Sequence, residues 1–153
     1  MQYIIHFLTA AGYYIYIETS NPRRPNDKAQ IVSANIVTKT TKCLTFWYHM
    51  YGSNVKALNV YLRFATTVGK PIWTHTGTLS NKWYQSQVDI QGNATYEIMF
   101  EGVRGTSYKG DIAVDDITVR EGSCAGLKLF GFFVFLFLKK FKIQSNFISR
   151  TIL

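Results

Sequence analysis

The sequence predicts an all-β domain built as an antiparallel β-sandwich. Aromatic residues make up 16% of the 153 residues, and Val, Ile, Thr, Tyr and Phe outnumber the helix-favouring Ala, Leu and Glu. Apolar residues alternate with polar ones in segment after segment, and turn signals recur at intervals of roughly 8 to 14 residues. A chain of this length suits one domain with its own hydrophobic core.

The first half of the chain supplies the earliest strands. Residues 12–19 read as a strand, residues 20–28 as an exposed loop because they hold Pro22 and Pro25, and residues 29–37 as a return to the sheet. Two half-buried strands follow on either side of the turn-rich segment 51–56. Their inward faces are predicted to be Leu44, Phe46, Tyr48 and Met50, and then Leu58, Val60, Leu62 and Phe64.

The second half repeats the pattern after breaks at residues 69–71, 81–82 and 91–93. Tyr96, Ile98 and Phe100 alternate with Glu97 and Glu101. The last strand, 110–120, carries adjacent acids that a simple alternation cannot place, since either Asp115 or Asp116 turns inward unless a bulge separates them. One of these carboxylates is therefore predicted to be partly buried, hydrogen-bonded within the sheet or bound to a cation.

The charge distribution argues against a nucleic-acid partner. Residues 125–153 hold five basic residues and no acidic ones, which leaves +3 of the total +8 on the first 124 residues. Nucleic-acid binding requires a basic stripe on the domain itself. We therefore expect no nucleic-acid interaction.

Three segments and a cysteine together resemble the C-terminal two-thirds of a MAM domain, the extracellular module of meprins, neuropilins and receptor tyrosine phosphatases. They are residues 43–52, the triplet Phe100, Glu101 and Gly102, residues 110–117, and Cys124. The resemblance covers residues 12–124 and implies a jelly-roll-type sandwich, incomplete at its N-terminal side. Residues 1–11 match none of the family's preceding segment.

The resemblance implies a disulfide between Cys43 and Cys124, although from the residues alone two buried free thiols remain an alternative. It also implies that Asp115 and Asp116 could hold a structural calcium-type ion, but the N-terminal segment that would supply further oxygens is missing. We expect no cofactor and at most an incomplete cation site. Independently, Asn93, Ala94 and Thr95 form a glycosylation sequon in a predicted turn.

No residue pattern indicates an enzyme. His49 has no serine, cysteine or second histidine placed to complete a site, so a partly buried structural role is predicted. The three histidines lack metal-binding spacing, and HExxH, GxSxG and P-loop motifs are absent from the sequence. Trp47, Trp73 and Trp83 are predicted to pack in or near the core as scaffold residues.

The two ends are predicted to lie outside the domain. Residues 1–11 make a poor secretory signal, and residues 125–153 form a basic, Phe-rich tail whose apolar run at 129–138 is too short to span a bilayer, where about 20 residues are needed. The tail could attach weakly to membranes. We prefer the explanation that both ends are non-native sequence from an incomplete or misread gene model.

The sequence thus predicts a non-catalytic, extracellular or cell-surface module for protein recognition or adhesion, which is a fragment of a larger MAM-containing protein. Whether a protein partner would be another copy of the chain or a different protein stays open. Two alternatives are an accessory-domain fragment of a secreted metalloprotease and a carbohydrate-binding jelly roll that uses exposed tryptophans such as Trp83.

Overall fold

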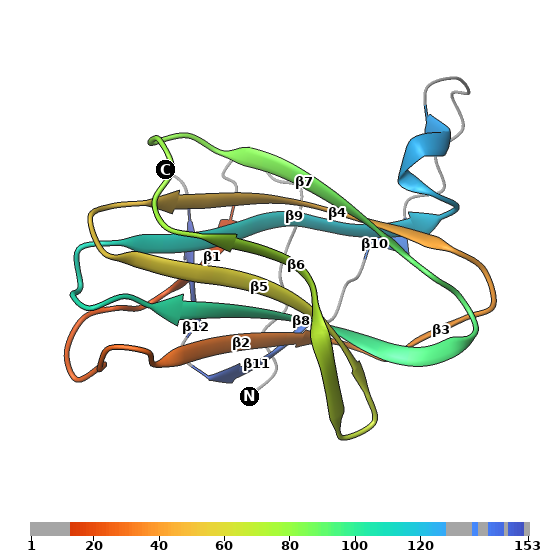
Figure 1. The fold of residues 1–153 in the computed structure, drawn as a ribbon, viewed down its shortest axis with the longest axis horizontal. Coiled ribbons are helices and arrows are strands. Elements are labelled where there is room, and N and C mark those ends of the chain that lie inside the picture. Colours follow the sequence, from red (N-terminus) through yellow and green to blue (C-terminus); the bar gives the residue numbers. More distant parts are fainter. Residues whose placement is uncertain (1–12, 128–135, 138–140, 146, 152–153) are drawn as a thin grey trace.

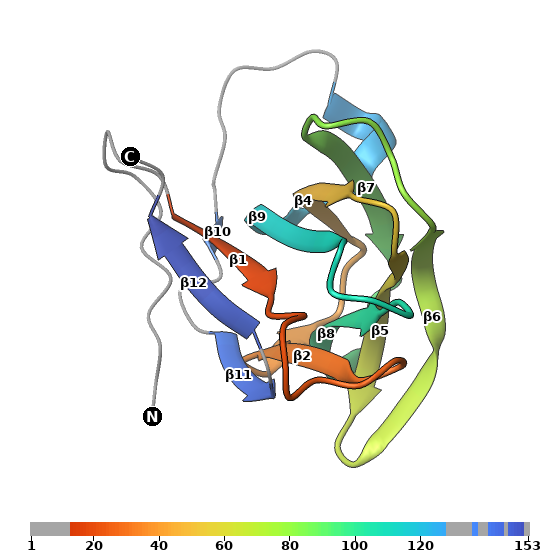
Figure 2. The ribbon, with the colours of Figure 1, turned by 90° about the vertical axis from the view of Figure 1, so that its left-hand side faces the viewer.

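The computed structural model describes residues 13–127, 136–137, 141–145 and 147–151. It confirms the predicted sandwich, because these residues form two facing sheets whose strand pairs are all antiparallel (Figures 1 and 2). The strands, with one short 3-10 helix η1, are β1 (Tyr13–Ile17), β2 (Lys28–Ser33), β3 (Ile36–Thr38), β4 (Lys42–Tyr51), β5 (Val55–Phe64), β6 (Thr67–Thr76), β7 (Tyr84–Ile90), β8 (Ala94–Arg104), β9 (Asp111–Glu121), η1 (Cys124–Leu127), β10 (Leu136–Phe137), β11 (Phe141–Ser145) and β12 (Phe147–Thr151).

Each sheet interleaves strands from distant parts of the chain. The first sheet has the order β12-β1-β9-β4-β7, with β10 also paired to β9. The second has the order β11-β2-β8-β5-β6, with β3 also paired to β8. The long central pairs β4/β9 and β5/β8 therefore form the middle of the sandwich, and β12, β7, β11 and β6 are the outermost strands of the two sheets (Figure 2).

The core follows the predicted alternation except at Phe64, which was expected on the inward face of β5 but is 42% exposed at the end of that strand. Leu44, Phe46, Tyr48 and Met50 of β4 are all buried, while the residues between them face outward. Across the sandwich the Phe46 ring meets the Phe100 ring edge-on at 5.1 Å, and Trp73 packs edge-on against Phe46 at the same distance. Edge-to-face rings at this distance are the preferred aromatic geometry, so they add specificity to the apolar burial between the sheets.

The break expected at residues 69–71 is wrong, because β6 runs through it and Pro71 pairs with Tyr61. Proline lacks a backbone N–H and is tolerated on edge strands, where one side of the strand needs no donor. β6 is the edge of the second sheet, and its register against β5 shifts on either side of Tyr61. The edge position explains why proline interrupts the register without ending the strand.

Two glycines of the family-like motif meet where the β4–β5 turn packs on the segment before β9. A Cβ on Gly52 would lie 2.6 Å from the Cα of Gly110, and Gly52 has a positive φ of 121°. The neighbouring amide of Asn54 donates to the carbonyl of Lys109 at 3.0 Å. The two turns therefore approach through their backbones, a contact that only residues without a side chain allow.

A buried polar network lies on the outer face of the second sheet. Glu101 is 3% exposed, and its carboxylate accepts from Gln30 at 2.6 Å, Tyr61 at 3.2 Å and Asn59 at 3.3 Å, with Lys28 at 3.3 Å. Alternation alone predicts a solvated outward glutamate at this position. The neighbouring strands instead supply enough donors to keep a buried carboxylate hydrogen-bonded.

The tail does not lie apart from the sandwich as expected. β10, β11 and β12 all come from residues 125–153, and they pair with β9, β2 and β1 respectively. Figure 2 shows β11 and β12 together on one side of the molecule and β6 and β7 on the other. Without them, β1 and β2 would present unpaired N–H and C=O groups at the sheet edges, and aromatic and β-branched residues in the tail are suited to pairing there.

The tail strands also complete sheet edges of a sandwich that was expected to be incomplete. The resemblance implies a sandwich that is incomplete at its N-terminal side, but β12 and β11 pair with the outer edges of β1 and β2. Part of the apolar run, Leu136–Phe137, is strand β10. Among the described residues, no helix has the length and apolar character needed to cross a membrane.

Candidate functional site on the outer face of the first sheet

A cleft of about 500 Å³ lies on the outer face of the first sheet. Its lining combines aromatic rings with acidic and hydroxyl side chains drawn from β1, β4, β9 and the loops beside them. The aromatic members are Tyr14, Tyr16, His49, Trp83 and Tyr108, and the polar members are Glu18, Thr19, Ser20 and Asp111. Ala113 also lines it. Among the described members of the lining there is no lysine or arginine.

Strand alternation brings these side chains to one surface. In β1, Ile15 and Ile17 are buried in the core, so Tyr14 and Tyr16 face outward. Ala113 of β9 pairs with Tyr16 on one side and with His49 of β4 on the other. The methyl group of Ala113 lies between two strands that carry aromatic rings and leaves space above the sheet. Ala113 therefore forms the floor of the cleft.

Trp83, just before β7, reaches across the sheet above this floor. Its ring lies 5.7 Å from the Tyr14 ring in an edge-on arrangement and 5.6 Å from the His49 ring. The His49 ring is held in turn, because its Nε2 lies 3.0 Å from Oδ1 of Asn81. The three rings therefore support one another and fix one wall of the cleft.

Two loops form the opposite wall. Thr19 donates through Oγ1 to the carbonyl of Tyr108 at 3.0 Å, which joins the segment after β1 to the segment before β9. The buried Arg104 donates through Nε to the carbonyl of Thr19 at 2.8 Å and through Nη1 to that of Gly105 at 3.3 Å. A carboxylate oxygen of Glu18 accepts from the Ser20 amide at 2.8 Å. These bonds hold both loops in place around the cleft.

A bulge separates the two acids of β9, which is one of the alternatives that the sequence left open. Asp116 has a positive φ of 46° and is exposed, and the β4/β9 register shifts between Thr45 and Trp47. Asp115 is half-buried opposite Trp47, and its carboxylate accepts from the Asp116 amide at 2.8 Å. Burial raises the pKa of Asp115 to about 6. The hydrogen bond from the Asp116 amide lowers this pKa, and the negative charge of Asp116 raises it further.

Within the described residues, no third histidine, cysteine, aspartate or glutamate side chain converges with Asp115 and Asp116. A calcium ion takes six to eight oxygens, and the incomplete cation site expected at this pair stays a prediction. The prediction that one acid is partly buried is confirmed for Asp115. The Asp115 carboxylate accepts its hydrogen bond from the backbone amide of Asp116.

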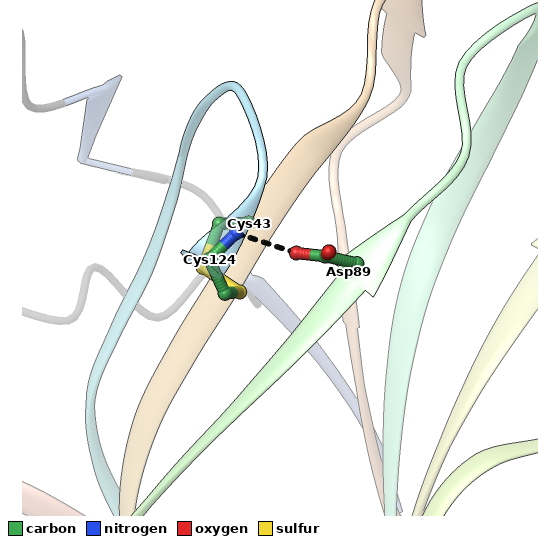
Figure 3. A group of neighbouring side chains, drawn as sticks. All are labelled: Cys43, Asp89 and Cys124. Carbon is green, nitrogen blue, oxygen red and sulfur yellow. Dashed lines mark hydrogen bonds between the residues drawn. A yellow bond between two sulfur atoms is a disulfide. The ribbon is translucent and has the colours of Figure 1, made fainter. Parts of the chain in front are cut away.

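The predicted disulfide joins Cys43 of β4 to Cys124 of η1, with the two Cα atoms 5.0 Å apart (Figure 3). Asp89 of β7 lies beside it and accepts from the Cys124 amide and from the Ser123 hydroxyl, both at 2.6 Å. These hydrogen bonds, the Cys124 amide first, lower the pKa of Asp89. Cys43, Asp89 and Cys124 converge like metal ligands, but both sulfurs are already bonded to each other.

The other residues singled out from the sequence agree with their predicted roles to different degrees. His49 is partly buried as expected, although it lines the cleft rather than serving the core alone. Trp73 packs against the core, but Trp47 is 36% exposed and Trp83 lines the cleft, so the scaffold role predicted for all three is wrong for Trp47 and incomplete for Trp83. Asn93 is exposed in the β7–β8 turn, as the sequon prediction expected, and its modification stays a prediction.

Sequence reasoning missed the cleft because its members come from separate segments. The outward positions of β1, Tyr14 and Tyr16, carried a signal, since two aromatic residues alternate there with Ile15 and Ile17. Glu18 extends the same outward series. The contributions of Asp111 and Tyr108 depend on the β1/β9 register, which the sequence does not give.

The sequence matches the family model for the MAM domain, meprin/A5/mu, over residues 4–125, so the match begins before the expected start at residue 12. It is 40% identical over 125 residues to MAM domain-containing glycosylphosphatidylinositol anchor protein 2 of Homo sapiens, which covers 74% of this chain and 13% of that protein. It is 43% identical over 120 residues to MAM domain-containing glycosylphosphatidylinositol anchor protein 1 of Gallus gallus. This match covers 76% of this chain and 12% of that protein.

Among solved structures, the fold is similar to the K3 cleaved adhesin domain of Lys-gingipain from Porphyromonas gingivalis W83. The TM-score is 0.58 at 18% identity, over 71% of this chain and 74% of that one. At this identity the likeness concerns the fold alone. The chain spans about an eighth of the length of the two anchor proteins.

Proposed function

The chain belongs to the MAM domain family, and from this membership we propose that it is an extracellular module for protein interaction or adhesion with no catalytic activity of its own. Two relatives are named as glycosylphosphatidylinositol anchor proteins, which supports a cell-surface location. Since the chain spans about an eighth of them, we also propose that it is one module of a larger MAM-containing protein.

The observation that carries this proposal is the clustering of exposed aromatic side chains around the cleft. Of the four exposed aromatics in the described part of the chain, three lie on the same side of the molecule as the cleft: Trp47 and Tyr51 flank His49 on the outer face of β4, and Tyr108 lines the cleft itself. Tyr108 is 62% exposed. Tyrosine and tryptophan are enriched at protein interfaces, where they supply large contact areas at a small entropic cost.

The hydrogen bonding of His49 supports the non-catalytic part of the proposal. A catalytic histidine needs a nucleophile or a substrate proton within hydrogen-bond reach. The Nε2 atom of His49 instead meets the side-chain amide oxygen of Asn81. This contact positions the ring, and an amide is not a nucleophile that the ring could activate.

A bead experiment tests the proposal. The purified full chain is coupled to beads, which are scored for aggregation with one another and for binding to a panel of cells. The test variant combines Trp47→Ser and Tyr108→Ser. The matched control combines Phe64→Ser and Val68→Ser, which removes exposed apolar side chains from the second sheet instead.

We expect wild-type and control beads to bind and the Trp47/Tyr108 variant to lose binding. Bead aggregation would indicate a homophilic partner, and cell binding without aggregation a heterophilic one. Wild-type beads that neither aggregate nor bind any cell would overturn the proposed function. Equal loss of binding in both double variants would overturn the assignment to this face.

A further inference from the structure

The Cys43–Cys124 disulfide has a guanidinium group against one of its two sulfurs. Arg120 of β9 pairs with Cys43 of β4, and its Nη2 lies 3.1 Å from the Cys43 Sγ. A disulfide sulfur carries no charge and is a weak acceptor, so the cation gains little from it while the bond is closed. A thiolate at the same place would accept a charge-assisted hydrogen bond. Arg120 therefore stabilises the opened bond more than the closed one.

From this contact we propose a modification site that goes beyond the adhesion function: the disulfide exchanges with small thiols, and Cys124 is the residue that they modify. The thiolate of the small molecule attacks the Cys124 Sγ and forms a mixed disulfide there. The Cys43–Cys124 bond breaks, and its electron pair leaves on the Cys43 Sγ as a thiolate beside Arg120. A thiolate of lower pKa leaves faster, and a neighbouring cation lowers that pKa.

Burial decides which of the two sulfurs is attacked. Cys43 is 0% exposed, whereas Cys124 is partly exposed at the start of η1. Gly122 and Ala125, on either side of Cys124 in the sequence, are exposed as well. A thiol from solution therefore reaches Cys124 first. Cys43 is then the leaving group, and it is the sulfur that Arg120 contacts.

Asp89 is the charge that opposes a thiolate at this bond. Its carboxylate lies within 4.8 Å of both sulfurs, and the hydrogen bond from the Cys124 amide lowers its pKa, so that it is ionised. Arg120 counters this charge at Cys43, where the guanidinium is in direct contact. The cation therefore favours the departure of Cys43, while Asp89 makes the other sulfur the poorer leaving group.

The same carboxylate keeps the two cysteines together after the bond opens. Asp89 pairs with Cys43 in the β4/β7 ladder, and its oxygens accept from the Ser123 hydroxyl and the Cys124 amide, both at 2.6 Å. Cys124 therefore stays at a high effective concentration beside Cys43. The Cys43 thiolate attacks the mixed disulfide, expels the small thiolate and restores the original bond, so the modification is reversible.

Exchange with 2-mercaptoethanol on the folded full chain tests the proposal. The reaction is stopped with acid, free thiols are capped with N-ethylmaleimide, and the peptides are mapped by mass spectrometry. Arg120→Gln removes the cation from the leaving sulfur, and Arg120→Lys keeps a cation there. The matched control is Arg63→Gln, which removes a partly buried arginine from its ion pair with Glu97 in the second sheet.

We expect early samples to carry the mercaptoethanol adduct on Cys124 and the maleimide on Cys43. Arg120→Gln should slow the exchange about fivefold, because the leaving thiolate loses its cation, while Arg120→Lys and Arg63→Gln should stay within about twofold of the wild type. Adducts found mainly on Cys43 would overturn the proposal. So would equal exchange rates in the wild type and in Arg120→Gln.

Low concentrations of urea separate attack on the folded protein from attack on the unfolded chain. Exchange through global unfolding accelerates steeply as urea lowers the stability, whereas exchange in the folded state changes little. We expect the wild-type rate to stay nearly constant below the unfolding transition, and the variants are compared in that range. A rate that rises in step with unfolding, or no exchange before unfolding, would overturn the proposal and leave the bond a structural cross-link only.

Discussion

Neutralising Asp115 should stabilise the protein at neutral pH. Burial holds the pKa of this carboxyl at about 6, above its ordinary 3.8, so the folded protein retains the proton more tightly than the unfolded chain. The stability linked to this group is fully present below about pH 4 and is lost as the pH rises through about 6. A shift of about two pKa units corresponds to about 3 kcal/mol, and solvent screening of a half-buried group reduces this to about 1.5 kcal/mol.

Asp115→Asn removes the charge that must be buried while an amide oxygen can still accept from the Asp116 amide. Urea unfolding followed by circular dichroism at about pH 7 should therefore show a gain of about 1.5 kcal/mol, equivalent to a melting temperature about 4 °C higher. At about pH 4 the gain should shrink to under about 0.5 kcal/mol, because the wild-type carboxyl is then protonated.

Asp116→Asn is the matched control, since that residue is exposed at a positive φ that asparagine tolerates. It should change stability little at either pH. A gain from Asp115→Asn that is the same at both pH values, or a loss at neutral pH, would refute the burial argument. Calcium that raises the wild-type melting temperature by several degrees, with the rise abolished in Asp115→Asn, would show instead that this carboxylate holds a cation.

Four further outcomes are expected. Tyr96→Phe should leave stability unchanged or raise it by up to about 1 kcal/mol in urea unfolding, because the Tyr96 hydroxyl is buried without a hydrogen-bond partner among the described residues; a loss above about 1 kcal/mol would reveal a hidden partner. Ending the chain at Ala125 should lower the melting temperature and promote dimers in light scattering, since β1 and β2 lose their edge partners; an equally stable monomer would show that the tail strands contribute nothing. Replacing Cys43 and Cys124 by alanine should cost about 2 to 4 kcal/mol, below the ~4.5 kcal/mol chain-entropy ceiling for a closed loop of this size, and an unchanged urea midpoint would contradict it. Asn93→Gln should remove one glycan's mass from material secreted by eukaryotic cells, as read by mass spectrometry, and identical masses would show the sequon is unused.

Local pattern was enough to predict the core and most strands. The alternation in β4 identified Leu44, Phe46, Tyr48 and Met50 as inward residues, because side-chain direction along a strand depends only on position. It failed at Pro71, where tolerance depends on β6 being an edge strand, a property of the whole sheet. The tail strands β11 and β12 were missed for the same reason, since their partners β2 and β1 lie more than a hundred residues away.

The cleft was harder to predict than the core. The resemblance gave the disulfide and the acidic pair, both of which lie in continuous motifs. The environment of Asp115 required the bulge and the Trp47 pairing, which follow from register rather than composition. Trp83 looked like a scaffold residue because nothing local shows that its ring crosses the sheet to reach Tyr14.

The pairing of the first and last strands determines how the domain would respond to pulling. Tyr13 at the start of β1 pairs with Thr151 at the end of β12, so a force applied at these two residues separates their ladder one pair at a time instead of shearing all pairs together. Unzipping resists little force, but it cannot extend the segment between Cys43 and Cys124 while their bond is intact. Because His49 and Trp83 lie inside that loop and Tyr14 and Tyr16 lie outside it, tension would draw the two tyrosine rings away from His49 and Trp83 and open the cleft.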